Sequence, residues 1–210
     1  MLTSPFSHGV IAALLVASLG MPAFAEAPDG GVYLRVFGGV SSLEDSDLSG
    51  AISGETGFDT GQVFGAAVGY DYAGSPFRSE LEYAYRTGDA DGAAGISGDL
   101  ASTTLALNGY YDFAPIADGR LVPYIGAGLA YVTEIDFDVS GGSAPGEYND
   151  TGVFGYQLMV GADYAISDRW SINGELRYFD AGDQSLSGPG GSLSADYQTI
   201  DVLVGASYRF

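Results

Sequence analysis

The feature that most constrains the fold is a period-two alternation of uncharged and polar residues, which recurs along the chain from Gly31 to Phe210. It is sharpest in FRSELEYAYR (77–86), where a set running from Phe77 to Tyr85 alternates with a second set that contains Arg78, Glu80, Glu82 and Arg86. Successive side chains of a β-strand point to opposite faces, so this pattern predicts strands with two chemically different faces. Seven further segments alternate in the same way: 32–40, 63–72, 102–113, 123–134, 153–164, 169–179 and 199–210.

The connections between these segments alternate in length, which gives the chain a direction. Three are short: AGSP, APIADGR and ISD. The others are expected to be long polar loops at 41–60, 88–98, 135–151 and 181–196. Eight strands with the short turns at one end form an antiparallel up-and-down meander that can close on itself. The content of 33 Gly, 15 Tyr and 11 Phe suits many strands with many turns. We therefore predict an all-β protein, an eight-stranded antiparallel barrel.

The distribution of arginine indicates which face of the barrel meets lipid. The formal net charge is −20, with seven Arg and no Lys, and five of the arginines share the polar face with carboxylates. An unpaired charge in a confined interior is costly, so a nearly balanced set of charges is typical of a lumen. The uncharged face then points to lipid, as in a transmembrane β-barrel. The predicted lumen charges are Arg35, Arg78, Glu80, Glu82, Arg86, Glu134, Asp163, Glu175, Arg177, Asp201 and Arg209.

A soluble barrel with the opposite polarity is the alternative to this assignment. In a lipocalin-like ligand carrier the apolar face would point inward and the charged face would meet water. The same alternation fits both proteins, so the direction of the charged face decides between them.

The N-terminal segment has the composition of a secretory signal peptide. An apolar run, VIAALLVASLG, is followed by Ala23-Phe24-Ala25, which matches a small-x-small cleavage site. We predict a signal peptide over 1–25 and one barrel domain over 26–210.

Two motifs resemble the small outer-membrane β-barrel family, which includes opacity-type surface antigens, OmpA and OmpX barrels and proteins called porin family. They are VPYIGAGLAY in mid-chain and GASYRF at the end of the sequence. The resemblance implies a bacterial outer-membrane location, with membrane lipid and lipopolysaccharide as surroundings. It also implies that Gly205, Tyr208 and Phe210 form the signal read by the barrel-assembly machinery. We expect no counterpart of the peptidoglycan-binding domain of full-length OmpA proteins after Phe210.

Composition argues against several kinds of chemistry. The enzymes among outer-membrane barrels generally use a histidine as the general base. The sequence after Ala25 contains no His and no Cys. We therefore predict no enzymatic activity, no cofactor and no metal site, since the acidic clusters LEDSD, DADG and DFD lack a complete calcium-loop pattern. The acidic charge opposes binding of nucleic acid.

The function that these features favour is a structural and surface-interaction role in the outer membrane, with acidic loops outside the cell. An eight-stranded barrel is just wide enough to be filled by its own side chains, so a general diffusion pore is not expected. The alternative is a narrow porin or a portal for ions or small apolar compounds.

Overall fold

The computed structural model describes residues 30–43, 46–50, 54–58, 60–92, 96–140, 146–150, 152–188 and 191–210. The predicted signal peptide lies outside these residues. Among them, no helix has the length and apolar character needed to cross a membrane.

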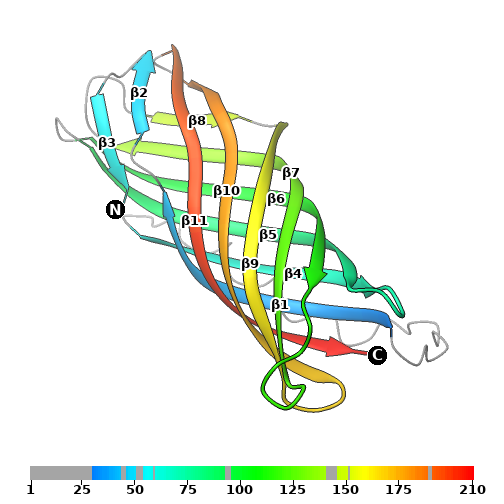
Figure 1. Ribbon diagram of the computed structural model, residues 1–210. Helices are drawn as coiled ribbons and strands as arrows, with labels where there is room; N and C mark the ends of the chain where they lie inside the picture. The colour runs from blue at the N-terminus through cyan, green and yellow to red at the C-terminus, as the bar shows by residue number, and fades with distance from the viewer. Residues whose placement is uncertain are drawn as a thin grey trace, which may run out of the picture.

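Eight long strands form a closed antiparallel barrel (Figure 1), as predicted. Consecutive long strands pair with each other, and β1 pairs with β11 from Tyr33 opposite Arg209 to Leu43 opposite Thr199, which closes the ring. Closure leaves no unpaired strand edge in the wall, as a membrane interior requires. The long strands are β1 (Gly31–Leu43), β4 (Gly61–Asp71), β5 (Phe77–Gly92), β6 (Ile96–Asp112), β7 (Leu121–Ser140), β9 (Val153–Ala165), β10 (Trp170–Gly188) and β11 (Gly191–Arg209).

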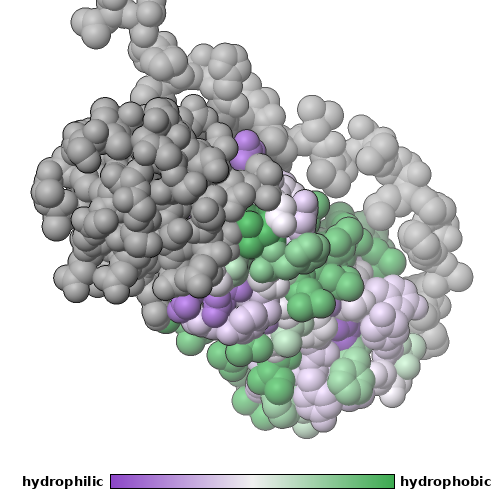
Figure 2. Space-filling model, turned by 90° about the horizontal axis from the view of Figure 1, so that it is seen from above, coloured by the Kyte–Doolittle hydropathy of each residue, from purple (hydrophilic) through white to green (hydrophobic). Residues whose placement is uncertain are grey.

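The apolar face of the wall points outward. Leu129, Val204 and Leu107 are 72%, 67% and 63% exposed, whereas Arg35 and Arg177 are 1% and 0% exposed. Figure 2 shows hydrophobic side chains spread over the visible flank of the described strands. This polarity is that of a barrel in lipid, so the soluble ligand-carrier alternative is wrong.

Aromatic side chains gather near both ends of the outer face. At the end with the short turns, the ring of Tyr208 lies 5.0 Å from the ring of Trp170 and 5.1 Å from that of Phe210. Toward the other end, the rings of Tyr131 and Phe154 are 5.1 Å apart. Two such belts are typical of a barrel whose ends lie at the two membrane–water interfaces.

The segments expected to be long loops are largely β-structure, which corrects the prediction. Strands β5 and β6 continue to Gly92 and Ile96, and three short strands lie in the remaining segments: β2 (Ser46–Gly50), β3 (Gly54–Phe58) and β8 (Gly146–Asp150). A strand ladder needs only backbone donors and acceptors, so it can continue where the sequence no longer alternates in polarity.

These short strands complete a second ring beyond the ends of β1, β4 and β9. Strand β2 pairs with β11 and with β3, and β3 pairs with β5, so the β2–β3 hairpin takes the place of β1 and β4. Strand β8 pairs with β7 and β10 and takes the place of β9. Figure 1 shows β2, β3 and β8 at the end of the barrel away from the short turns. The long-loop end is therefore a hydrogen-bonded continuation of the wall.

A bulge in β7 reverses the predicted direction of one charge. Thr104 is opposite Val132 and Thr103 is opposite Glu134, so Thr133 is an extra residue without a partner in the ladder. Val132 and Ile135 are both buried, and Glu134 between them is exposed. Glu134 therefore points away from the lumen, and its assignment to the lumen charges is wrong, because strict alternation cannot anticipate a bulge.

Candidate functional site: ion pairs in the barrel lumen

The lumen is filled by a set of buried ion pairs that we call the lumen network. Its cations lie on the inward faces of three strands: Arg35 on β1, Arg78 and Arg86 on β5, and Arg177 on β10. Four arginines and four carboxylates balance in charge, and all eight residues are at most 6% exposed. The lumen network comprises Arg35, Arg78, Arg86, Arg177, Glu80, Glu82, Glu175 and Asp201.

Arg177 occupies the centre of the lumen network. Its Nη1 and Nη2 donate to Oε1 and Oε2 of Glu82 at 2.7 and 2.8 Å, a two-point pair across the barrel. Its Nε and Nη2 also donate to Oε1 of Glu175 at 3.1 and 2.8 Å. The planar guanidinium has enough donors in fixed directions to bind two carboxylates at once, which lysine cannot do in this geometry.

Arg35 extends the lumen network toward the end with the short turns. Its Nη2 donates to Oε2 of Glu175 at 3.1 Å and its Nη1 to Oε2 of Glu80 at 3.4 Å. Tyrosine hydroxyls complete the shell of both carboxylates: Tyr124 donates to Glu175 at 2.9 Å, and Tyr33 donates to Glu80 at 2.7 Å. Buried carboxylates are tolerated when donors of this kind satisfy them.

Arg86 and Asp201 form a second group, nearer the long-loop end. Nε and Nη2 of Arg86 donate to Oδ2 of Asp201 at 3.1 and 2.8 Å, and Ser41 Oγ donates to Oδ1 at 2.6 Å. The third donor, Nη1, bonds Thr104 Oγ1 at 3.1 Å. The Phe179 ring centroid lies 5.0 Å from Arg86 Cζ.

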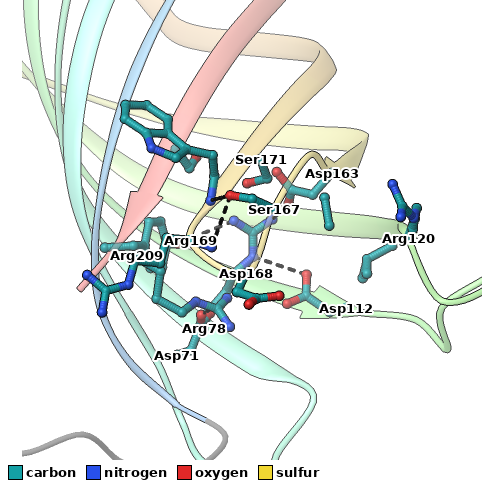
Figure 3. Close-up of a pocket in the computed structure, with 15 residues that line it drawn as sticks. Asp71, Arg78, Asp112, Arg120, Asp163, Ser167, Asp168, Arg169, Ser171 and Arg209 are labelled. Atoms are coloured by element: carbon teal, nitrogen blue, oxygen red, sulfur yellow. Dashed lines mark hydrogen bonds and ion pairs between the residues drawn. The ribbon is translucent and has the colours of Figure 1, made fainter.

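Arg78 closes the lumen at the short-turn end. Its Nη1 lies 3.4 Å from Oε1 of Glu80, its Nε 3.0 Å from Oδ1 of Asp112 and its Nη2 3.1 Å from Oδ2 of Asp163. Figure 3 shows Arg78 between the side chains that line this mouth. The rings of Tyr110 and Tyr124 have centroids 4.4 and 4.5 Å from its Cζ. Cation–π contacts of this kind add to ion pairing where water is excluded.

The structure brings most of the predicted lumen charges together. Arg209 and Asp163 lie on the inward face but at the mouth, where Arg209 pairs with Asp71 and its side chain is 53% exposed. Glu134 is the exception and lies on the outer face. The other eight are buried inside the barrel.

Several residues that bond the arginines and carboxylates of the lumen were not among the predicted lumen charges. Asp71 and Asp112 alternate with outward residues in the same way as the residues that were chosen, so strand parity alone could have found them. The inward tyrosines Tyr33, Tyr110 and Tyr124 have no distinguishing signal in the sequence, because tyrosine also forms the outer belts.

The three residues of the predicted assembly signal lie on β11 and at its end. Gly205 packs closely, since a Cβ placed there would lie 2.6 Å from Asn173 Oδ1 and 2.9 Å from the Val36 carbonyl oxygen. Tyr208 and Phe210 belong to the outer aromatic belt near the short turns.

Among the residues that the structure describes, no three or more His, Cys, Asp or Glu side chains are grouped so that they could hold a metal ion. The segment LEDSD lies in part outside the described residues, the backbone but not the side chains of DADG is described, and in DFD the one described side chain is that of Asp136.

Comparison with known proteins places this geometry in context. A family model described as the outer membrane protein beta-barrel domain matches residues 11–210. Outer membrane protein W of Vibrio cholerae is 24% identical over 219 residues, which cover 94% of this chain and 96% of that protein. Outer membrane protein PagN of Salmonella typhimurium is 29% identical over 147 residues, and the match spans 59% of each chain.

Two solved structures are similar in fold. OprG of Pseudomonas aeruginosa gives a TM-score of 0.58 at 17% identity, covering 87% of this chain and 98% of that one. Neisserial surface protein A gives a TM-score of 0.54 at 16% identity, covering 86% and 97%. At these identities the likeness concerns the barrel fold alone.

Proposed function

Because this chain belongs to the outer membrane protein beta-barrel family and its place is the bacterial outer membrane, we propose that it is a closed-lumen barrel with a structural and surface-interaction role. The observation that carries this proposal is the lumen network. Arg177 of β10 is 0% exposed, and its guanidinium bonds Glu82 of β5 across the lumen and Glu175 of its own strand. A diffusion pore needs an open aqueous path, whereas here charged side chains bonded to one another occupy the lumen.

We propose further that the short turns face the periplasm and the second ring faces the cell exterior. Short periplasmic turns and longer external segments are the usual arrangement in bacterial barrels. All seven arginines of the chain lie in the lumen or toward the short turns, so the long-loop segments carry acidic residues without basic ones. The partners proposed for this surface are outer-membrane lipid and lipopolysaccharide, and no motif specifies a further partner for the loops.

Electrical recording in planar bilayers tests the closed lumen. We expect the refolded protein to give no stable single-channel current. The double variant Glu82→Ala and Arg177→Ala serves as the matched positive control, because it removes both sides of the central ion pair and leaves space for water and ions. A stable current from the unmodified protein would instead favour a narrow portal for ions or small apolar compounds.

The proposal includes no catalytic role. The sequence after Ala25 contains no His and no Cys, and the carboxylates of the lumen network are committed to arginines and tyrosines. Mass spectrometry of lipid A from cells that overexpress the protein tests this point. A change in lipid A mass would contradict it.

We propose that Phe210 has a role in assembly, and an experiment can separate this proposed role from an effect on stability. The Phe210→Ala variant should refold in detergent as the unmodified protein does, since the side chain is 49% exposed and the backbone bond from its N–H to the Val32 carbonyl is retained. In cells we expect less assembled barrel, measured in outer-membrane fractions. Phe113→Ala is the matched control, because Phe113 is an aromatic residue of the short-turn end with 45% exposure. Equal loss in both variants would mean that Phe210 acts only as a belt residue.

A further inference from the structure

The barrel mouth at the short-turn end contains a cavity of about 200 Å³ (Figure 3). Arg78 is the member of the lumen network that lines this cavity and separates it from the other members, so the cavity is a pocket at the end of the barrel, below a closed lumen. Pockets for drug-sized ligands measure about 300–1,000 Å³, so only a small molecule fits here.

The cavity lining has as many positive as negative side chains, and only some of these charges are paired with one another. Four arginines and four aspartates line the cavity: Arg78, Arg120, Arg169, Arg209, Asp71, Asp112, Asp163 and Asp168. The inner charges are paired, because Arg78 is bonded to Asp112 and Asp163 and Arg209 to Asp71. A lining of zero net charge attracts neither a simple anion nor a simple cation strongly.

Two exposed charges at the rim have no such partner. Arg120 ends the turn between β6 and β7, and Asp168 lies in the turn between β9 and β10. Within the described ranges, neither side chain makes a hydrogen bond or an ion pair. Arg169 is not unpartnered, because its Nη1 donates to the Tyr208 hydroxyl at 3.3 Å. The cavity therefore presents one available cation, Arg120, and one available anion, Asp168, at its rim.

Backbone hydrogen bonds join the two turns that carry these charges. The N–H of Ala165 donates to the carbonyl oxygen of Arg120 at 2.8 Å, which joins the two turns. The turn before Arg120 is itself closed by bonds from the Arg120 N–H to the Ala117 carbonyl and between Ile116 and Leu121. Ser167 Oγ accepts from the Trp170 N–H at 3.1 Å and orders the turn that carries Asp168. Backbone order in the two turns reduces the conformational entropy that is lost when a ligand binds between them.

We propose that this cavity binds a small zwitterion with a free ammonium and a free carboxylate, of the size of an amino acid or dipeptide. The carboxylate pairs with Arg120 and the ammonium with Asp168. A ligand that carries both charges replaces water at both groups without adding net charge to a neutral pocket. Binding at this cavity does not require transport, because Arg78 lies between the cavity and the rest of the lumen.

The test uses the refolded full chain in detergent micelles with 15N-labelled arginine, titrated with Ala-Ala. The chain has seven arginines, so their Nε–H signals can be resolved and assigned by single Arg→Gln variants. We expect a saturable shift of the Arg120 signal with a Kd on the order of 1 mM, because exposed ion pairs are individually weak. The signals of Arg35, Arg86 and Arg177, deep in the lumen network, should not move.

Binding should weaken when the ligand loses its ammonium or its carboxylate, and also when the rim loses the charge of Arg120 or of Asp168. Calorimetry measures the affinity in each case. Acetyl-Ala-Ala lacks the ammonium and Ala-Ala-amide lacks the carboxylate, and each should bind about twofold to fivefold more weakly than Ala-Ala. The variants Arg120→Gln and Asp168→Asn should weaken Ala-Ala by a similar factor. Asp118→Asn is the matched control: Asp118 lies in the turn of Arg120 at φ 57, which asparagine tolerates, and does not line the cavity.

Three results would overturn the proposal. The first is the absence of a saturable shift at Arg120. The second is equal binding of Ala-Ala and its two singly charged derivatives, which would indicate an effect of ionic strength or of the methyl groups. The third is an equal loss of affinity in Asp118→Asn, which would indicate a disturbed turn. Heat-dependent gel mobility of each variant establishes that it is folded before it is titrated.

Discussion

Arg177 illustrates how a single side chain can hold the interior of this barrel together. It is fully buried and bonds Glu82 and Glu175, so its charge is compensated from two directions. Bringing such charges out of water costs several kcal/mol per ion, and pairing offsets this cost when the geometry is good and further hydrogen bonds satisfy the carboxylates. Loss of one partner leaves the other charge buried and unpaired, so each member of the network matters for stability.

Glu175→Ala tests this dependence at the level of one residue. The substitution removes an acceptor from Arg35, Arg177 and Tyr124 together. We expect the free energy of unfolding to fall by about 3–5 kcal/mol, measured by urea titration of the barrel in lipid vesicles. Glu134→Ala is the matched control, since it removes the same chemical group from the exposed outer face and should change stability by about 0.5 kcal/mol or less. Similar losses in the two variants would contradict the buried network.

Contacts between guanidinium groups and aromatic rings are a further reason why the cations of the lumen are arginines. Arg35 and Arg177 have Cζ atoms 5.1 and 5.2 Å from the ring centroid of Phe37, which is buried in the lumen. A guanidinium can stack on a ring and still direct its N–H groups in its own plane toward carboxylates. The small lumen of an eight-stranded barrel is thus filled by layers of ions and rings.

At the scale of strands, a position that breaks the alternation changes which of the following side chains face the lumen. The bulge at Thr133 in β7 shifts the parity of the strand, so that Ile135 is buried and Glu134 is exposed. Thr133 Oγ1 donates to the Thr103 carbonyl at 3.2 Å and satisfies an acceptor beside the irregular pairing. A bulge therefore reassigns every side chain that follows it to the opposite face.

The β2–β3 hairpin allows the two rings to be separated experimentally. Replacing 44–59 with a short Asn-Gly turn removes β2 and β3 but keeps the direct pairing of β1 with β4, which extends to Ser41 opposite Gly61. We expect faster amide hydrogen exchange at 90–92 and 193–194, which lose their partners in β3 and β2. Amides of the β1–β4 ladder should keep their protection. Faster exchange there would show that the membrane ring depends on the hairpin.

At the scale of the whole molecule, closure is the main source of resistance to unfolding. Every long strand has two neighbours, so the wall offers no free edge from which the ladder can be opened. The outer face is apolar between two aromatic belts, and the lumen is filled by paired charges. Lipid outside and ion pairs inside thus stabilise the same ring.

Gel electrophoresis of unheated and boiled samples tests closure directly. The unheated barrel should resist dodecyl sulfate and migrate differently from the boiled chain. Val202→Pro should abolish this difference, because Val202 lies between Val40 of β1 and Leu176 of β10 and proline removes a ladder donor. Val202→Ala, which keeps the backbone donor, should retain it. Identical mobility of unheated and boiled unmodified protein would contradict a closed barrel.

The sequence by itself determined the barrel, its strand order and the polarity of its wall. These properties follow from local rules: side-chain parity has a period of two, short turns join neighbouring strands, and charges avoid lipid. Tyr83 and Glu82 are adjacent in sequence and lie on opposite faces for this reason alone.

Only the tertiary structure decided which charges meet. Arg86 pairs with Asp201, 115 positions away, and Arg177 pairs with Glu82, 95 positions away. Such partners depend on the stagger between strands around the ring, which no local pattern encodes. The bulge at Thr133, the second ring and the cavity between the turns of Arg120 and Asp168 arise in the same way, from backbone pairing between segments distant in sequence.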